Sequence, residues 1–249
     1  MIAAQCFDVS IGVQCRPIDA PAVSAHLPLG STPISPTEAN HRFVLESQNE
    51  NLFSVRCGRS ARSTEPQSFD SALKTLQKAL YLCIAEHAKH YVFVHAGVVA
   101  WKNRIIVFPG SSYAGKSTLV WSFVQAGAVY YSDEYAVFDE QGGVSPFALP
   151  IALRLDGETR QMIMPDNIGA CRLKPDLVVF ARYRPDAIWR PRLLQPAAAM
   201  MQLLRHSIAI RANPALVVPV LKQVSLQSQT FVGTRGEARQ LLAWLNSID

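Results

Sequence analysis

The spacing of apolar residues in the middle of the chain predicts a helix followed by two strands. Between residues 69 and 90, one stripe of positions recurs at steps of three and four, as in an amphipathic helix: Leu73, Leu76, Leu80, Ile84 and His87. The run YVFVHAGVVAW at 91–101 indicates a strand, and Ile105–Phe108 is apolar without alternation, which is typical of a strand covered on both faces. The segment 117–127 then predicts a helix that ends at Gly127.

The N-terminal part of the chain has a different pattern. Within residues 1–60, short apolar runs alternate with turn-forming residues, as in a set of short strands. The segment HLPLGSTPISPTEAN at 26–40 carries prolines that the interior of a helix would not tolerate, so it reads as a loop. We therefore predict a small β-rich N-terminal unit over residues 1–68 and a second domain over residues 69–249.

The remaining pattern mixes strands and helices. The segment AVYYSDEYAVFDEQGGVSP at 128–146 indicates a strand, a polar break, a second strand and a turn. Beyond Pro150 the pattern is looser, and it predicts strands and helices in turn: strands at 149–155, 177–183 and 215–220, helices at 197–207 and 236–246. Strands and helices that alternate in this way predict an α/β fold.

Composition supports a folded protein without a membrane segment. Hydrophobic residues make up 49% of the 249 positions and charged residues 17%. The first residues, MIAAQCFDVSIG, lack the basic start and unbroken apolar run of a signal peptide. The most apolar stretch, at 91–101, is too short to span a bilayer. These features predict a cytoplasmic protein with no membrane partner.

The cysteines argue against a disulfide framework and against a zinc site. Their number is odd, they are spread along the chain, and they form no CxxC pair: Cys6, Cys15, Cys57, Cys83 and Cys171. No pair of histidines has the spacing of metal ligands. We expect reduced and mostly buried thiols, as is common for free cysteine.

The net charge of +5 lies wholly in the C-terminal part of the chain. Residues 151–249 hold 13 Lys and Arg against 7 Asp and Glu, and the basic residues are densest in ARYRPDAIWRPR at 181–192. Such a surface suits an acidic peptide or phosphates, and it suits an ordinary solvated hairpin equally well. No signature of a DNA- or RNA-binding module accompanies it, so we predict no nucleic-acid partner.

A phosphate-binding motif connects the predicted strand at 105–108 to the helix that follows. Residues 110–117, GSSYAGKS, fit the P-loop pattern GxxxxGK[ST]. Glycines let the backbone amides curl around phosphates, and the helix N-terminus adds its free N–H groups. Lys116 would reach the β- and γ-phosphates of ATP, and Ser117 would bind Mg²⁺. The predicted nucleotide-binding residues are Gly110, Ser111, Ser112, Tyr113, Ala114, Gly115, Lys116, Ser117 and Thr118.

An acidic pair and a histidine outside the loop suggest a reaction as well as binding. Asp133 and Glu134 follow the strand after the P-loop helix, where one carboxylate would face a substrate and the other a metal ion. At a strand end, such a pair is also compatible with a simple turn. His95 interrupts the apolar run 91–101 and is a third candidate, although a buried core histidine would give the same pattern.

These residues resemble a known family. VHAGVVAWKNRIIVFPGSSYAGKST and AGAVYYSDEYAVFDEQGGVSPFALPIALR, within residues 91–154, are similar to the catalytic domain of HPr kinase/phosphorylase. They are closer still to the shorter related proteins of bacterial peptide-modification clusters, including those for lasso peptides. The resemblance implies a P-loop domain with a mixed sheet, related to phosphoenolpyruvate carboxykinase, and Mg²⁺-dependent transfer of phosphate from ATP to a serine. It implies Asp133 as general base, Lys116 and His95 as catalytic residues, and Ser117 with Glu134 at the metal.

The departures from the family leave the acceptor open. Tyr113 replaces a glycine of the family's loop, Glu134 replaces its second aspartate, and the later glycine-rich signature that helps bind HPr is missing. Arg154 is a weak match to a phosphate or acceptor contact. The chain is expected to be a serine kinase for a peptide or small protein. A nucleotide-binding accessory that recruits a peptide and a kinase of a small hydroxylated metabolite stay open, as does a homo-oligomer.

Overall fold

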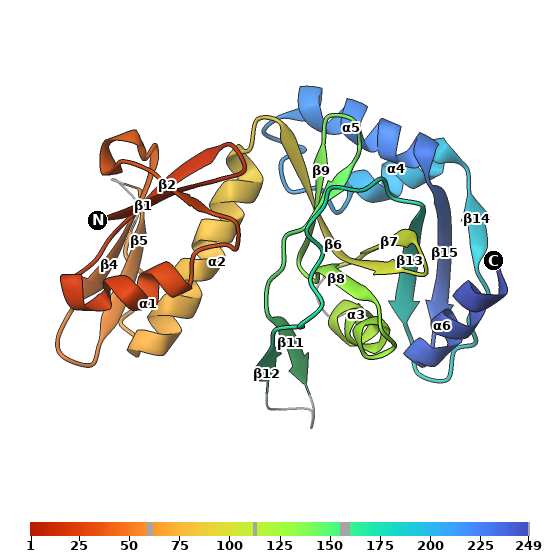
Figure 1. Cartoon of the computed structure of the whole chain (residues 1–249), viewed down its shortest axis with the longest axis horizontal. Coiled ribbons are helices and arrows are strands. Elements are labelled where there is room, and N and C mark those ends of the chain that lie inside the picture. Colours follow the sequence, from red (N-terminus) through yellow and green to blue (C-terminus); the bar gives the residue numbers. More distant parts are fainter. Residues whose placement is uncertain (59–61, 112–113, 155–159, 249) are drawn as a thin grey trace. The chain divides into compact units, whose positions relative to one another are not determined.

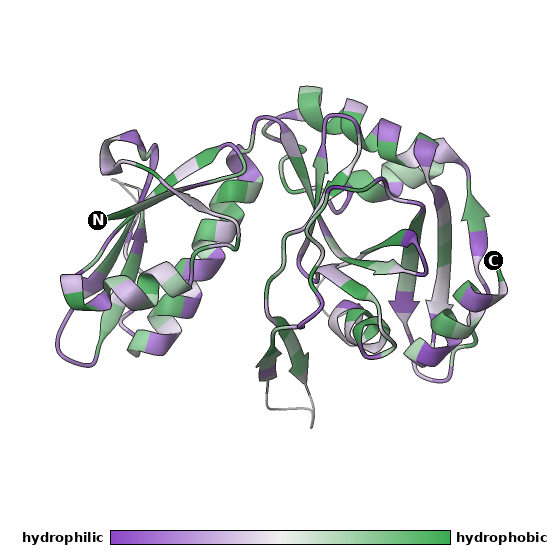
Figure 2. Ribbon diagram, viewed as in Figure 1, coloured by the Kyte–Doolittle hydropathy of each residue, from purple (hydrophilic) through white to green (hydrophobic). Residues whose placement is uncertain are grey.

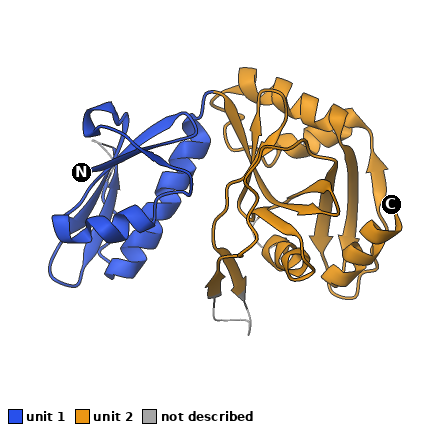
Figure 3. Cartoon of the chain, viewed as in Figure 1, with its two compact units in different colours: residues 1–89 blue, residues 90–249 orange. Residues whose placement is uncertain are grey.

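The computed structural model describes residues 1–58, 62–111, 114–154 and 160–248 of the chain. It divides into two compact units, Met1–Lys89 and His90–Asp249 (Figure 3). The boundary falls after Lys89, whereas the sequence placed it after residue 68. The reason is that helix α2 (Phe69–His87) packs on strands of the first unit, so the helix belongs to the N-terminal unit and not to the domain that follows.

The first unit is a sheet with helices. Its described strands pair in the order β3-β1-β2-β4-β5: β1 Ile2–Cys6, β2 Val9–Gln14, β3 Thr32–Pro33, β4 His41–Ser47 and β5 Phe53–Cys57. Helix α1 (Ala20–Ala25) and α2 complete the unit. The stripe predicted for α2 is confirmed at its apolar positions, since Leu73, Leu76, Leu80 and Ile84 are all buried, whereas His87, its fifth member, is exposed. Figure 2 shows both hydrophobic (green) and hydrophilic (purple) residues along α2.

The second unit is built on a mixed sheet. Its described strands pair in the order β10-β9-β6-β7-β13-β15-β14, with β8 beside β6: β6 Tyr91–Trp101, β7 Arg104–Pro109, β8 Val129–Ser132, β9 Tyr135–Asp139, β10 Val144–Ser145, β13 Leu177–Tyr183, β14 Arg192–Leu194 and β15 Gln229–Arg235. β7, β13 and β15 run parallel, and the other pairs are antiparallel. β11 (Ile151–Arg154) and β12 (Arg160–Ile163) form a separate antiparallel pair.

Helices cover both faces of this sheet (Figure 1). α4 (Pro196–Leu204) and α5 (Pro214–Gln227) pack on one face, and α3 (Lys116–Gln125) and α6 (Ala238–Ser247) on the other. Strand β7 alternates between the two cores: Ile105 and Val107 face the first, and Ile106 and Phe108 face the second. The prediction of a strand covered on both faces is therefore confirmed, and the fold is mixed α/β.

One predicted strand was wrong. Residues 215–220 belong to helix α5, because Pro214 occupies the first helical turn and the Asn213 side chain accepts a hydrogen bond from the Leu216 amide at 3.3 Å. Four residues of α5 at helical spacing, Val217, Val220, Leu221 and Val224, are buried in the core. This tertiary burial outweighs the β-propensity of the run LVVPV. The strand that lies beside β13 in the sheet is β15, which the sequence did not predict.

The cysteine prediction also needs correction. All five thiols lie in the described part of the chain and are free, but only Cys6 is fully buried. Cys57 and Cys171 are exposed, and Cys15 and Cys83 are half-buried. Thiols are therefore accessible in both units. Among the helices in the described residues, none has the length and apolar character needed to cross a membrane.

Candidate active site at the carboxyl edge of the parallel strands

The parallel strands β7, β13 and β15 bring three chain segments together at their carboxyl ends. The Tyr183 amide, at the end of β13, donates to the Ala114 carbonyl at 3.4 Å. The Arg184 amide donates to the carbonyl of Arg235, the last residue of β15, at 2.9 Å. This edge of an α/β sheet is where ligands commonly bind, since loops and helix N-termini converge there.

The predicted P-loop segment lies at this edge, between β7 and α3. Gly115 is the N-cap residue of α3 and has a φ of 78°, a left-handed conformation that glycine adopts without strain. The Gly110 amide donates to the carbonyl of His95 at 3.2 Å, which joins the start of the loop to β6. Ser112 and Tyr113 lie outside the described residues. The strand, loop and helix context that the motif requires is present around them.

A close contact sets the position of helix α3. A Cβ atom at Gly97 of β6 would lie 2.4 Å from Val120 Cγ2 of α3, so the helix packs directly on the strand backbone. This contact explains why a glycine stands two residues after His95, since any side chain there would collide with the helix. Because Lys116 is the first residue of α3, the contact also determines where the lysine side chain begins.

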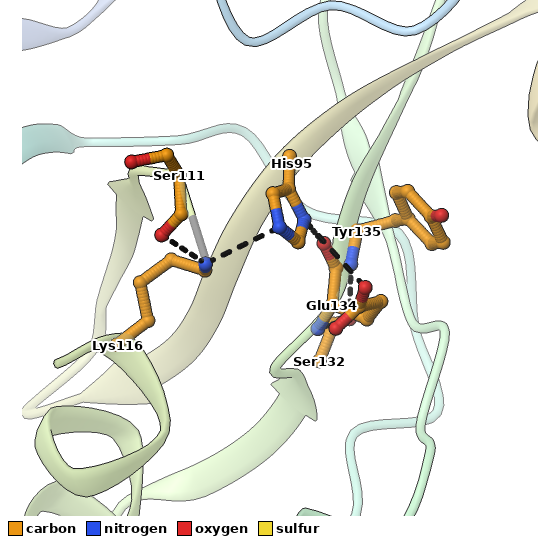
Figure 4. A network of polar contacts seen from close by, with 6 residues as sticks. All are labelled: His95, Ser111, Lys116, Ser132, Glu134 and Tyr135. Atoms are coloured by element: carbon orange, nitrogen blue, oxygen red, sulfur yellow. Dashed lines mark hydrogen bonds and ion pairs between the residues drawn. The ribbon is translucent and has the colours of Figure 1, made fainter. Parts of the chain in front are cut away.

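Lys116 points to the centre of the site (Figure 4). Its Nζ donates to the Ser111 carbonyl at 3.1 Å and lies 3.4 Å from His95 Nε2. Burial lowers the pKa of Lys116, and the nearby carboxylates of Asp133 and Glu134 partly oppose that shift. The ammonium group is thus partly shielded from water and contacts a carbonyl and a ring nitrogen, which leaves its positive charge available to an anion.

His95 connects the lysine to the acidic pair. Its Nδ1 lies 2.8 Å from the Glu134 carbonyl, which only accepts, so this nitrogen carries the proton and donates. In that tautomer Nε2 is the acceptor that faces Lys116 Nζ. The Glu134 carboxylate is half-exposed and lies 3.8 Å from the same Nδ1. His95 is therefore a polar link within the site and not a core histidine.

Asp133 is a buried acid directly after β8. Only 6% of the residue is exposed, and its Oδ1 atom has no hydrogen-bond partner among the residues that the structure describes. Burial raises the pKa of Asp133 to about 6; the Ser117 hydroxyl, which donates to it, and Lys116 act in the opposite direction, and Glu134 raises it further. A carboxylate with this pKa is ionised at neutral pH and still accepts a proton readily.

The turn that presents the two acids is held by Ser132. The Ser132 hydroxyl accepts hydrogen bonds from the amides of Glu134 at 3.3 Å and Tyr135 at 3.1 Å (Figure 4). This local motif sends consecutive side chains in different directions. Asp133 turns into the protein toward Ser117, and Glu134 turns toward His95 and solvent.

The structure thus brings together Lys116, Ser117, His95, Asp133 and Glu134. The Ser117 hydroxyl lies close enough to the Asp133 carboxylate to lower the pKa of Asp133, and the prediction of Ser117 and Glu134 as metal ligands stays a prediction. Thr118 is exposed one residue further along α3. Arg154 is the last residue of β11, and its side chain lies outside the described part of the chain.

Two basic residues of the site were missed by the sequence analysis. Arg235 is 2% exposed, and its guanidinium donates to the Gly115 carbonyl through Nη2 and to the Gly236 carbonyl through Nη1, both at 2.8 Å. The His206 carbonyl accepts from the His95 amide at 2.8 Å. Burial, His95 and Lys116 lower the pKa of the His206 imidazole, so it lies near both. Both are remote in sequence from the motif, and no local pattern marks them.

The fold and the site define a mixed α/β protein with a lysine-bearing loop and a buried acid at the carboxyl edge of its parallel strands. Comparison with models of known protein families gives no match, and comparison with curated proteins gives none either. The functional argument therefore rests on the residues of the site.

Proposed function

We propose that the chain is an ATP-dependent serine kinase that transfers the γ-phosphate to a serine hydroxyl of a peptide or small protein. One observation carries the proposal: the lysine of a P-loop motif meets a buried carboxylate at the same sheet edge, and one oxygen of that carboxylate has no hydrogen-bond partner in the described part of the chain. A lysine in this motif is expected to bind phosphate, and a carboxylate beside it suits a base that receives a hydroxyl proton.

The residues of the site fit a nucleotide with its metal ion. A Cβ on Gly110 would lie 3.2 Å from Ala114 Cβ and 3.4 Å from Lys116 Cγ, so glycine allows the loop to fold tightly over the lysine stem. The Ser117 hydroxyl and the oxygens of Asp133 and Glu134 are the hard ligands that Mg²⁺ prefers. When bound, Mg²⁺ neutralises charge on the transferred phosphoryl group.

Each residue of the site would have its own role in phosphate transfer. The Lys116 ammonium, desolvated and bonded to neutral groups, holds the phosphates. Asp133 takes the proton of the serine hydroxyl while that oxygen forms its bond to the γ-phosphorus and the bond to ADP breaks. His95 positions both neighbours, since it donates to the Glu134 backbone and accepts from Lys116. Cytoplasmic ATP would be the donor.

The fold and the charge distribution are compatible with this proposal. We propose that the second unit is an HPr kinase-like P-loop domain, related to phosphoenolpyruvate carboxykinase, and its mixed sheet supports that relationship. The segment 182–192, next to the loop through Tyr183, exposes four basic residues: Arg182, Arg184, Arg190 and Arg192. We propose that they attract an acidic acceptor peptide.

The proposal is tested by incubation of the protein with Mg·ATP and an acidic peptide that contains one serine. We expect a mass gain of one phosphate on the peptide, read by mass spectrometry. Asp133→Asn should abolish transfer and keep ATP binding, whereas Asp166→Asn, at an exposed position of the same unit, should transfer normally. Transfer by the Asp133→Asn variant would contradict the assignment of the base.

Two other outcomes of this experiment would support a different function. ATP binding with an unmodified peptide would support the accessory that recruits a peptide without phosphorylating it. Phosphorylation of free serine, added as a second acceptor, with the peptide unchanged would support a kinase of a small hydroxylated metabolite. Each of these outcomes leaves the nucleotide site intact and changes only the acceptor or the reaction.

A further inference from the structure

Three side chains with metal-binding atoms meet in the first unit, away from the proposed kinase site. His41 begins β4, and Cys83 and His87 lie one turn apart near the end of α2. One ligand atom of each lies within 4.8 Å of the other two. The imidazole rings of His41 and His87 are 4.3 Å apart between centroids, and the Cys83 sulfur is 3.8 Å from His87 Nδ1.

A hydrogen bond of His87 determines which of its two ring nitrogens is free to bind a metal. His87 Nδ1 lies 2.9 Å from the carbonyl of Cys83, which only accepts, so Nδ1 donates and Nε2 keeps its lone pair. Metal-binding histidines commonly donate their second nitrogen to a carbonyl in this way, which orients the ring.

We propose that His41, Cys83 and His87 form a binding site for zinc or a similar thiophilic divalent cation, with a fourth position open to solvent or another ligand. Two imidazoles and a thiolate are a ligand set that zinc prefers. Ligands at about 2.0–2.3 Å from a tetrahedral ion lie about 3.3–3.7 Å apart. Small side-chain rotations would therefore close the present separations of up to 4.8 Å.

The site would join two elements of the first unit. His41 comes from the sheet, and Cys83 and His87 come from the helix that packs on that sheet. A bound ion would fasten the end of α2 to the start of β4 and stabilise the folded unit, since the ligands are not held together in the unfolded chain. The sequence did not indicate this site, because His41 is far in sequence from the Cys83–His87 pair.

Cobalt titration of the whole protein tests the proposal. Co²⁺ bound by a thiolate and two imidazoles gives a thiolate-to-metal charge-transfer band in the near ultraviolet and intense visible bands of a four-coordinate ion. We expect saturation at one ion per chain and displacement of the spectrum by Zn²⁺. Cys83→Ser should remove the charge-transfer band. Cys57→Ser, at the exposed thiol of neighbouring strand β5, should keep it.

A second variant distinguishes the loss of metal binding from a defect in folding. His87 is exposed, so His87→Ala should fold, and it should weaken Zn²⁺ binding more than about 100-fold, beyond the effect of losing an outer hydrogen-bond partner. Zn²⁺ should raise the melting temperature of the parent protein and not that of His87→Ala. A parent protein without the charge-transfer band, or a band that survives in Cys83→Ser and disappears in Cys57→Ser, would overturn the assignment.

Discussion

At the scale of single residues, Asp133 has a proposed role in phosphate transfer and also lowers the free energy of unfolding when it is ionised. Its pKa is raised from 3.8 to about 6, chiefly by burial, so the folded chain binds the proton more tightly than the unfolded chain does. Well below pH 3.8 both states carry the proton and the cost is absent. As the pH rises toward 6, only the unfolded state ionises freely, and stability falls.

Asp133→Asn should therefore stabilise the fold at high pH while it abolishes phosphate transfer. A shift of about two pKa units corresponds to an upper limit of about 3 kcal/mol in the free energy of unfolding, because each unit is worth about 1.4 kcal/mol. Urea denaturation of the parent and the variant at about pH 4 and about pH 8 measures the effect. If the difference between the two proteins is the same at both values, Asp133 does not have the raised pKa.

Arg235 offers a second prediction for a single side chain. Its guanidinium supports the carbonyl of Gly115, directly before Lys116, from a buried position. Arg235→Met should lower the free energy of unfolding by about 2 kcal/mol, since bonds to a charged donor are lost, and should weaken ATP binding. Arg239→Met, at an exposed position of α6, is the control and should change stability by less than about 0.5 kcal/mol. Equal effects of the two changes would contradict the role of Arg235.

Part of the candidate site could be predicted because its residues are close in sequence. The loop motif, Ser117 and the acidic pair lie within one strand–helix–strand segment, and His95 stands out in an apolar run. Arg235 and His206 could not be predicted, because they reach the site only through the pairing of β15 with β13 and the turn after α4. The choice between Asp133 and Glu134 as partner of Ser117 also depends on the turn at Ser132.

At the scale of elements, the contact between β6 and α3 determines where the lysine of the loop lies. Gly97→Ala would place a Cβ 2.4 Å from Val120 Cγ2, which should destabilise the chain by about 1–3 kcal/mol through overpacking. Val120→Ala removes the clashing atom. In the double variant we expect a favourable coupling of at least about 1 kcal/mol, measured by denaturation of all four proteins. Additive effects of the two changes would show that α3 does not rest on Gly97.

The elements also show which helices and strands can be predicted from local sequence alone. Helices α2 and α3 and strands β6, β7 and β13 follow their patterns, because each has a long apolar run or a clear helical period. Helix α5 does not follow its local pattern, because its β-branched residues favour a strand. Burial of one face of the helix in the core outweighs that preference. Strand β15 was not predicted, because QTFVGTR contains a glycine and only two adjacent apolar residues, although its Thr, Phe and Val residues favour strands.

At the scale of the whole molecule, the chain consists of two compact units, each with buried apolar residues of its own. Two compact units predict two unfolding transitions in scanning calorimetry if they unfold independently, and a ligand then stabilises only the unit that binds it. At a concentration about 100-fold above its dissociation constant, Mg·ATP should stabilise the second unit by about 2.7 kcal/mol and leave the first unit unchanged. A single transition that shifts as a whole with Mg·ATP would contradict independent units.

The unit boundary shows a limit of sequence reasoning at this scale. The amphipathic period of α2 predicts the helix and its buried face, but it does not say which sheet covers that face. The contacts with β4 and β5 assign the helix to the N-terminal unit. The same assignment brings Cys83 and His87 to His41, so the proposed cation site depends on it.

The central claim is that the loop around Lys116 binds a nucleoside triphosphate, and isothermal titration of Mg·ATP into the protein tests it most directly. We predict saturable heat at one nucleotide per chain, which is lost in Lys116→Met and kept in Lys222→Met, at an exposed lysine of α5. No heat with the parent protein, or equal binding by the parent and the Lys116→Met variant, would contradict the account.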